Sequence, residues 1–239
     1  MENQKAIAII TARGGSKRIP KKNIRNFCGR PILSYSIDAA LQSGLFDEVM
    51  VSTDSEEIAG IAKEAGAQVP FLRSAFTSGD FASSDDVLRE VLQNYAAAGR
   101  MFDVMCCLYP TAPFITAEKL RQAYGVLETS GADSVMPVTR FSYPPQRAFI
   151  LRDGLLQYKF PQYENSRSQD LEPIYHDCGQ FYFYRVRNDL SFECSRFAPL
   201  IVPDTEVQDI DNEDDWKIAE VKYRTFIEDK QRASREGQK

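Results

Sequence analysis

Short apolar runs that alternate with helical patterns constrain the fold of this 239-residue chain more than any other feature. Ala6–Ile10 reads AIAII, which is typical of a strand buried on both faces of a parallel sheet. Pro31–Leu41 follows with apolar residues at helical spacing, and a proline suits the first turn of a helix. Further strands are expected at 48–52, 104–109, 133–138 and 180–184, and further helices at 56–65, 87–98, 117–127 and 216–227.

This order of elements predicts an α/β sandwich with a mainly parallel sheet. Right-handed crossovers then place the loops that follow the strands at one edge of the sheet, which is where ligands bind in such folds. The order breaks at about 141–177, a stretch rich in Tyr, Pro and Gln without helical periodicity. We interpret this stretch as an insertion that either covers the site or makes a dimer contact. We therefore expect one domain over 1–228 and a frayed tail at 229–239.

The composition argues against several classes of protein. A formal charge of −5 does not suit broad electrostatic binding to nucleic acid. No run of about 18 apolar residues exists, so no membrane-spanning helix is expected, and the N-terminus lacks the pattern of a signal peptide. Five cysteines without a CxxC pair favour reduced thiols, and a single histidine, His176, argues against zinc. We expect a cytoplasmic protein without nucleic-acid or membrane partners.

The segment Thr11–Asn23, TARGGSKRIPKKN, holds five cationic and no acidic side chains directly after the first expected strand. It matches neither the Walker A pattern GxxxxGK[ST] nor the dinucleotide pattern GxGxxG. Gly14 and Gly15 would let main-chain N–H groups approach an anion, and the cations would neutralise phosphate charges. A solvated basic turn is the alternative. The position of this basic loop at the carboxyl end of a strand favours a polyphosphate-binding α/β enzyme.

Further motifs accompany the basic loop, namely VSTD at 51–54, FLR at 71–73, ASS at 82–84, PTAP at 110–113 and QDID at 208–211. Together they resemble, over nearly the whole chain, the CMP-sialic acid synthetase family of cytidylyltransferases, which activate nine-carbon acidic sugars. The resemblance implies a Rossmann-like nucleotide-diphospho-sugar transferase sandwich with a mixed, mainly parallel sheet and a small irregular lid or dimerisation insertion. It also implies a reaction in which CTP and the sugar give a CMP-sugar and pyrophosphate.

Within that family, some stretches look most like the members that act on pseudaminic acid. These stretches are CCLYPTAPF at 106–114, SYPPQRAF at 142–149, SQDLEP at 168–173 and YHDCGQFYF at 175–183. The same chemistry on N-acetylneuraminate or legionaminate is the nearest alternative. A catalytically silent nucleotide-binding module is an alternative of another class, and a nicotinamide-dependent oxidoreductase is disfavoured by the missing GxGxxG.

The resemblance implies that the basic loop holds the triphosphate of CTP and that Arg13 stabilises charge developing on the phosphates. Lys22 closes the loop and is a further catalytic candidate. Arg73 could instead be a surface cation, and Ser83 and Ser84 could cap the following helix. The residues expected to bind CTP are Ala12, Arg13, Gly14, Gly15, Ser16, Lys17, Lys22, Asn23, Arg73 and Ser84.

Asp209 and Asp211 stand two residues apart in an apparently extended segment. Alternation along a strand would put both carboxylates on one face, where hard oxygen ligands suit Mg²⁺. We therefore expect these two aspartates to be catalytic metal ligands. The alternative is that Asp211 only caps the final helix.

A sugar that carries a carboxylate calls for a cation that faces it. Arg167 matches a family position near the sugar, and the other sugar candidates are Gln146, Arg147, Gln169, Tyr175, His176 and Gln180. A lone histidine more often makes structural hydrogen bonds than catalytic ones, and the general base is not identified from sequence. The resemblance further implies a homodimer in which the insertion reaches toward the partner.

Overall fold

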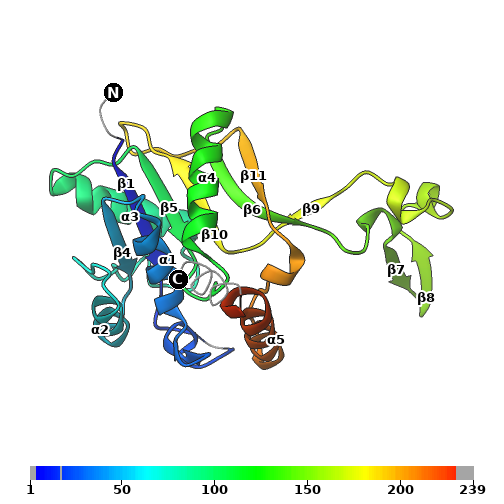
Figure 1. The fold of residues 1–239 in the computed structure, drawn as a ribbon, viewed down its shortest axis with the longest axis horizontal. Helices are drawn as coiled ribbons and strands as arrows, with labels where there is room; N and C mark the ends of the chain where they lie inside the picture. The colour runs from blue at the N-terminus through cyan, green and yellow to red at the C-terminus, as the bar shows by residue number, and fades with distance from the viewer. Residues whose placement is uncertain (1–3, 17, 230–239) are drawn as a thin grey trace, which may run out of the picture.

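The computed structural model describes residues 4–16 and 18–229, and its ribbon is drawn in Figure 1. A central sheet has the strand order β11-β6-β10-β5-β1-β4, with β9 paired to β6 beside this path. Its strands are β1 (Ala6–Thr11), β4 (Glu48–Ser52), β5 (Val104–Leu108), β6 (Ser134–Arg140), β9 (Tyr175–Asp177), β10 (Phe181–Arg185) and β11 (Phe197–Ile201).

The sheet is mixed but mainly parallel, as the sequence predicts. Strand β1 pairs in parallel with β4 and with β5, so that Ile9 lies beside Met50 on one side and Cys107 on the other. Strand β10 runs antiparallel to both β5 and β6, and β11 is parallel to β6. Strands β1, β4, β5, β6 and β11 therefore share one direction, and β9 and β10 run against it.

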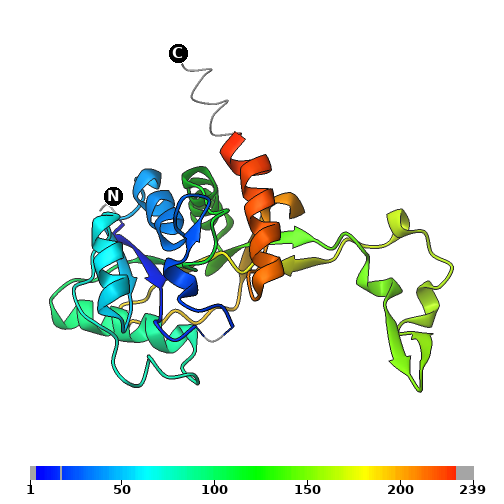
Figure 2. The same cartoon turned by 90° about the horizontal axis from the view of Figure 1, so that it is seen from below.

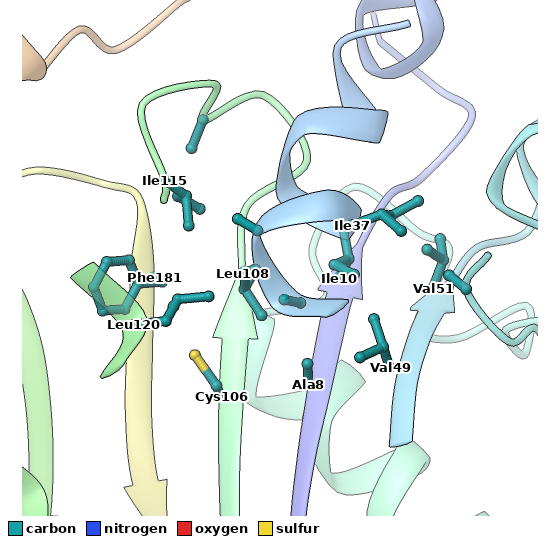
Figure 3. Packing of buried hydrophobic residues seen from close by; sticks show 14 of the residues in the cluster. Ala8, Ile10, Ile37, Val49, Val51, Cys106, Leu108, Ile115, Leu120 and Phe181 are labelled. Carbon is teal, nitrogen blue, oxygen red and sulfur yellow. The ribbon is translucent and has the colours of Figure 1, made fainter. Parts of the chain in front are cut away.

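Alternation along the buried strands separates two apolar clusters on the two faces of the sheet. Ala8 and Ile10 pack with α1 (Leu33–Ser43), α2 (Glu56–Glu64) and α4 (Ala117–Ser130), as Figure 3 shows for part of this cluster. Ile7 and Ile9 pack instead against α3 (Ser84–Ala97). A strand with apolar residues at every position is what two covered faces require.

A third apolar cluster holds α5 (Glu213–Tyr223), which continues as a π-helical turn at Arg224–Glu228. Phe27 belongs to the small hairpin of β2 (Asn26–Phe27) and β3 (Arg30–Pro31) and makes edge-to-face contacts with Trp216 and Tyr223. The segment just before α5 joins this cluster through Ile210, which is 1% exposed. The C-terminal helix is thereby fixed beside the basic loop.

The expected insertion leaves the body of the protein as a long extension (Figures 1 and 2). It contains the hairpin of β7 (Phe149–Arg152) and β8 (Leu155–Tyr158) and short 3-10 turns at Pro145–Arg147, Pro161–Tyr163 and Ser168–Asp170. The side chains of Leu151, Leu155 and Leu156 on this hairpin are about two-thirds exposed.

The ten strands and helices expected from sequence are confirmed, with shifts at their ends. Helix α3 starts at Ser84 rather than 87, because Ser83 caps it. The expected tail, apart from Asp229, lies outside the described residues. In the part of the chain that the structure describes, no helix has the length and hydrophobicity needed to cross a membrane.

Candidate active site

A cavity of about 520 Å³ lies at the carboxyl ends of β1, β4 and β5. This is the edge at which parallel α/β folds bind ligands. Its lining is rich in hydroxyl groups, from Ser16, Thr77, Ser83, Ser84 and Thr111, and in cations, from Arg13, Arg18, Lys22 and Arg73. A cavity with this lining suits a polyanion that also carries groups for hydrogen bonding.

The basic loop is fixed on both sides of Arg13. The amide of Ala12 donates to the carbonyl of Ser52 at 2.9 Å, and the buried Asn23 donates through Nδ2 to the carbonyl of Arg13 at 2.8 Å. The guanidinium pairs with Asp80, which also lines the cavity, at 3.0 Å, with the two side chains 40% and 49% exposed. The main chain is therefore held while the charged group stays accessible.

Gly14 contacts the residues that follow β4. Its amide donates to Oδ1 of Asp54 at 2.7 Å, and a Cβ at this position would lie 3.3 Å from Cβ of Ser55. That distance is tighter than a side chain normally tolerates, so the glycine permits the contact. Gly15 has nothing within 4 Å of a Cβ position and is exposed. The amide expected to face an anion thus faces a carboxylate here.

Arg73 is held by the last residue of β4. Its Nε donates to Oγ of Ser52 at 2.8 Å and its Nη2 to the carbonyl of Ser52 at 2.9 Å. Burial lowers the pKa of Arg73 to about 10, and the nearby carboxylate of Asp54 opposes that effect. The alternative of an ordinary surface cation is therefore wrong, because the guanidinium is fixed against the cavity wall.

Lys22 and Arg18 join the basic loop to the segment before α5. Lys22 Nζ donates to the carbonyl of Ile210 at 2.6 Å and lies 3.9 Å from Oδ1 of Asp211. Arg18 Nη1 lies 2.7 Å from the other carboxylate oxygen of Asp211. Burial lowers the pKa of Lys22, while Asp211 and then Asp209 act to raise it. Residues far apart in sequence thus meet at one side of the cavity.

Two expectations about the aspartates need correction. The segment around Asp209 is a loop between the 3-10 turn Asp204–Glu206 and α5, so strand alternation does not decide where the two carboxylates point. Asp211 does not cap α5 either, because Asn212 does, and Asp215 completes the capping box. The Asp211 amide donates to Asp215, and its carboxylate pairs with the basic loop.

The carboxylates of Asp209 and Asp211 can hold Mg²⁺ only together with other ligands. Among residues 4–16 and 18–229, no group of three or more His, Cys, Asp or Glu side chains could hold a metal ion. Mg²⁺ commonly takes one or two carboxylates and fills its other positions with water and phosphate oxygens. Asp209, which is exposed, and Asp211 meet that need only when a phosphate ligand shares the ion.

The two serines before α3 have separate roles. Ser83 caps the helix, because its hydroxyl accepts a hydrogen bond from the amide of Asp86. In return, the Asp86 carboxylate accepts one from the amide of Ser83. Ser84 is the first helical residue and lines the cavity without serving as the cap. The capping alternative therefore holds for Ser83 and not for Ser84.

None of the sugar candidates lines this cavity. Arg147 and Arg167 are exposed on the extension, and Gln169 borders a second hollow of about 740 Å³. Tyr175 and His176 are exposed on β9, where the histidine ring lies 4.7 Å from that of Phe141. The structure of a single chain thus separates these side chains from the nucleotide candidates.

Two of the sugar candidates are buried. Gln180 is 1% exposed and donates through Nε2 to the carbonyl of Glu206 at 2.8 Å. Gln146 is 9% exposed and donates to the carbonyl of Glu172 at 2.8 Å. The Oε1 atoms of both side chains are buried and accept no hydrogen bond from the described residues, so each could accept one from a ligand hydroxyl, and both expectations stay predictions.

The sequence analysis did not name Asp54, Asp80 or Tyr109 as site residues. Lys17, which it expected to bind CTP, lies outside the described residues. Tyr109 directly follows β5 and lines the cavity, with its ring 5.5 Å from that of Tyr182. Its position directly after a buried strand is the sequence feature that could have predicted a site residue here. Nothing in the sequence signals the partners of Arg13 and Gly14, because the chain brings them together from other loops.

The fold and the cation-lined cavity define an α/β protein with a polyanion site. The sequence model of the Cytidylyltransferase family matches residues 7–185, and the chain belongs to that family of nucleotidyltransferases. The nicotinamide-dependent alternative is thereby excluded.

Similar proteins agree with this assignment. A pseudaminic acid cytidylyltransferase of Campylobacter jejuni is 41% identical over 92% of this chain and 97% of its own length. A CMP-N,N'-diacetyllegionaminic acid synthase of Legionella pneumophila is 34% identical over 90% of this chain and 94% of its own. The fold is shared with a structure of CMP:2-keto-3-deoxy-manno-octonic acid synthetase complexed with CTP, at a TM-score of 0.65 and 17% identity over 91% of this chain and 97% of that one.

Proposed function

We propose that this protein transfers CMP from CTP to pseudaminate and releases pyrophosphate. The observation that carries the proposal is that Arg13 and Lys22 line one cavity, beside which Asp211 lies 3.9 Å from Lys22. The high identity to a pseudaminic acid cytidylyltransferase over nearly both whole chains supports the choice of sugar.

The ion pairs of the structure indicate how the triphosphate would bind. In this proposal, phosphate oxygens replace the carboxylate oxygens of Asp80 on Arg13 and of Asp211 on Arg18. Exposed pairs of this kind contribute only about 0–1 kcal/mol each. The Arg13 guanidinium would donate charge-assisted hydrogen bonds to the triphosphate as it does to Asp80, so the exchange of Asp80 for phosphate would cost little.

The reaction forms a bond between the anomeric oxygen of the sugar and the α-phosphorus, and the bond to the pyrophosphate oxygen breaks. The sugar hydroxyl loses its proton, and pyrophosphate leaves with the electron pair. Arg13 and Lys22 would neutralise charge on the phosphates, and Arg73 and Ser84 would position the nucleoside. Asp209 and Asp211 would hold Mg²⁺, which supplies charge neutralisation at the phosphate oxygens.

The sugar site needs the extension of a second copy. Arg167 and Gln169 lie on the extension, and none of the sugar candidates lines the cavity of their own chain. The exposed leucines on the β7–β8 hairpin suit a protein surface that covers them. We therefore infer a homodimer in which each extension brings Arg167 toward the partner's cavity.

Complementation tests this shared site. The variants Arg13→Ala and Arg167→Ala should each be nearly inactive. When their subunits are exchanged by mixing, half of the dimers are mixed and each mixed dimer regains one intact site. About a quarter of the normal activity should return. If each extension serves its own chain, mixing restores nothing.

Pyrophosphate release from CTP and Mg²⁺ tests the function itself, with pseudaminate, legionaminate and N-acetylneuraminate as acceptors. Release with pseudaminate alone is the expected result. Release with another sugar would keep the chemistry and overturn the substrate. If CTP binds and no acceptor gives release, the silent nucleotide-binding module becomes the better description.

A further inference from the structure

An ion pair between Lys119 and Glu206 is buried next to the segment that carries Asp209 and Asp211. Its Nζ–Oε2 distance is 2.8 Å, and the two side chains are only 10% and 8% exposed. The same ammonium donates to the carbonyl of Phe114, at 2.9 Å, in the loop that follows β5. One charged group in the first turn of α4 therefore connects two loops at the carboxyl edge of the sheet.

Stability alone does not account for this pair. Desolvation of two charges is costly, and buried pairs can often be replaced by apolar residues without loss of stability. Helix α4 is already anchored by Leu120, Ala123 and Leu127, whose side chains are 0% exposed. The pair adds little to that docking, but it fixes where Glu206 lies.

The main chain around Glu206 is bound from other elements as well. Gln180, directly before β10, donates to the carbonyl of Glu206 at 2.8 Å. Lys222, on α5, donates to the carbonyl of Val207 at 2.8 Å and to that of Asp204 at 3.2 Å. These bonds come directly before the loop of residues 208–211, which forms no helix or strand of its own.

We propose that the Lys119–Glu206 pair is a positioning device that presets Asp209 and Asp211 for metal binding beside the basic loop. Neither residue of the pair lines the cavity, so the pair acts through the main chain of residues 204–211. The inference rests on the proposed function, in which the two aspartates hold Mg²⁺.

The test replaces both charges at once, in Lys119→Met with Glu206→Met, so that no unpaired charge is left buried. Hydrogen exchange of residues 204–212 in the metal-free protein should become about tenfold faster, while the midpoint of thermal unfolding stays close to that of the wild type. The Mg²⁺ concentration for half-maximal pyrophosphate release should rise about tenfold, with little change in kcat at saturating metal. Faster local exchange and a higher Mg²⁺ requirement, at an unchanged unfolding temperature, distinguish a role in positioning the aspartates from a role in overall stability.

A matched control removes another ion pair. Glu48 and Arg100 pair at 2.9 Å at the amino end of β4, with side chains 11% and 46% exposed. Glu48→Gln with Arg100→Met should alter neither the exchange of residues 204–212 nor the Mg²⁺ requirement. Lys222→Met serves as a second variant, because the carbonyls that Lys222 binds are neutral and its removal leaves no unpaired charge on them. We expect it to speed exchange at 204–208 and to raise the Mg²⁺ requirement.

The possible results test the positioning role, the link to the metal and the proposed function separately. Unchanged exchange at 204–212 in the double variant overturns the positioning role. Faster exchange with an unchanged Mg²⁺ requirement overturns the link to the metal. If the double variant does not fold, Lys119→Gln with Glu206→Gln, which keeps polar side chains of similar length without the charges, takes its place in the same two measurements. A wild-type protein that releases no pyrophosphate overturns the proposed function, while the exchange data still decide whether the pair fixes the loop.

Discussion

Replacement of Asp211 by Asn separates the role of this residue in binding from its role in folding. The carboxylate pairs with Arg18 at 2.7 Å, and the two side chains are 39% and 71% exposed. An exposed pair contributes about 0–1 kcal/mol, and an asparagine keeps the shape and an oxygen acceptor. Because Asn212 and not Asp211 caps α5, the helix start is untouched. We expect the free energy of unfolding to fall by less than about 1 kcal/mol.

The effect of Asp211→Asn on turnover should be far larger. A neutral amide oxygen is a poorer ligand for a hard divalent cation than a carboxylate. Loss of a single group that stabilises developing charge typically lowers kcat by about 100-fold to 1,000-fold, or roughly 3–4 kcal/mol. At limiting Mg²⁺ we expect a loss of at least about a hundredfold, part of which returns as the Mg²⁺ concentration rises.

Pyrophosphate release over a series of Mg²⁺ concentrations measures the effect on turnover, and thermal unfolding measures the effect on stability. Asp214→Asn is the matched control, because Asp214 lies in the first turn of α5, is 85% exposed and pairs only on the surface with Lys217. Near-normal turnover of Asp211→Asn at limiting Mg²⁺ would refute the role of Asp211 as a metal ligand. A large loss of stability would refute the energy argument.

Other perturbations have equally definite outcomes. Ser83→Ala removes the cap of α3 and should lower the free energy of unfolding by about 1 kcal/mol in urea, whereas Ser84→Ala should raise KM for CTP and leave stability nearly unchanged. Burial lowers the pKa of Lys22 below 10.5, so the unfolded state binds more protons between the two pKa values and stability rises with pH there. Activity that needs the charged lysine is lost over the same range. Lys22→Arg should move the alkaline limb of the rate profile to higher pH, and an unmoved limb would assign it to another group.

The strands and helices could be predicted because each follows from a local pattern. Ala6–Ile10 is apolar at every position since both faces of the sheet are covered. The expectation of a strand around Asp209 failed for the opposite reason. The side chains of Lys22, Gln180 and Lys222 donate to main-chain carbonyls of that segment and shape it, and no local pattern encodes these bonds. The expectation of Pro31 in the first helical turn is wrong, because Pro31 ends β3 and α1 begins at Leu33.

The candidate site could be predicted only as far as motifs mark it. The glycines and cations of the basic loop are contiguous, so their shared location follows from the sequence itself. The carboxylates that contact them, Asp54 and Asp80, come from loops after other elements and depend on tertiary packing. The burial of Gln180 likewise depends on Glu206, which lies 26 residues further along the chain.

The reversed direction of β10 has a consequence for how this fold can change its substrate. The extension leaves at Arg140, where β6 ends, and the chain returns through β9 to Phe181, which pairs with Leu108 at the end of β5. Both ends of the extension are therefore anchored at the edge of the sheet that holds the cavity. Its length and sequence can vary without disturbing the register of β1, β4 and β5. Exchange of this segment between relatives should retarget the acceptor sugar and leave the nucleotide unchanged.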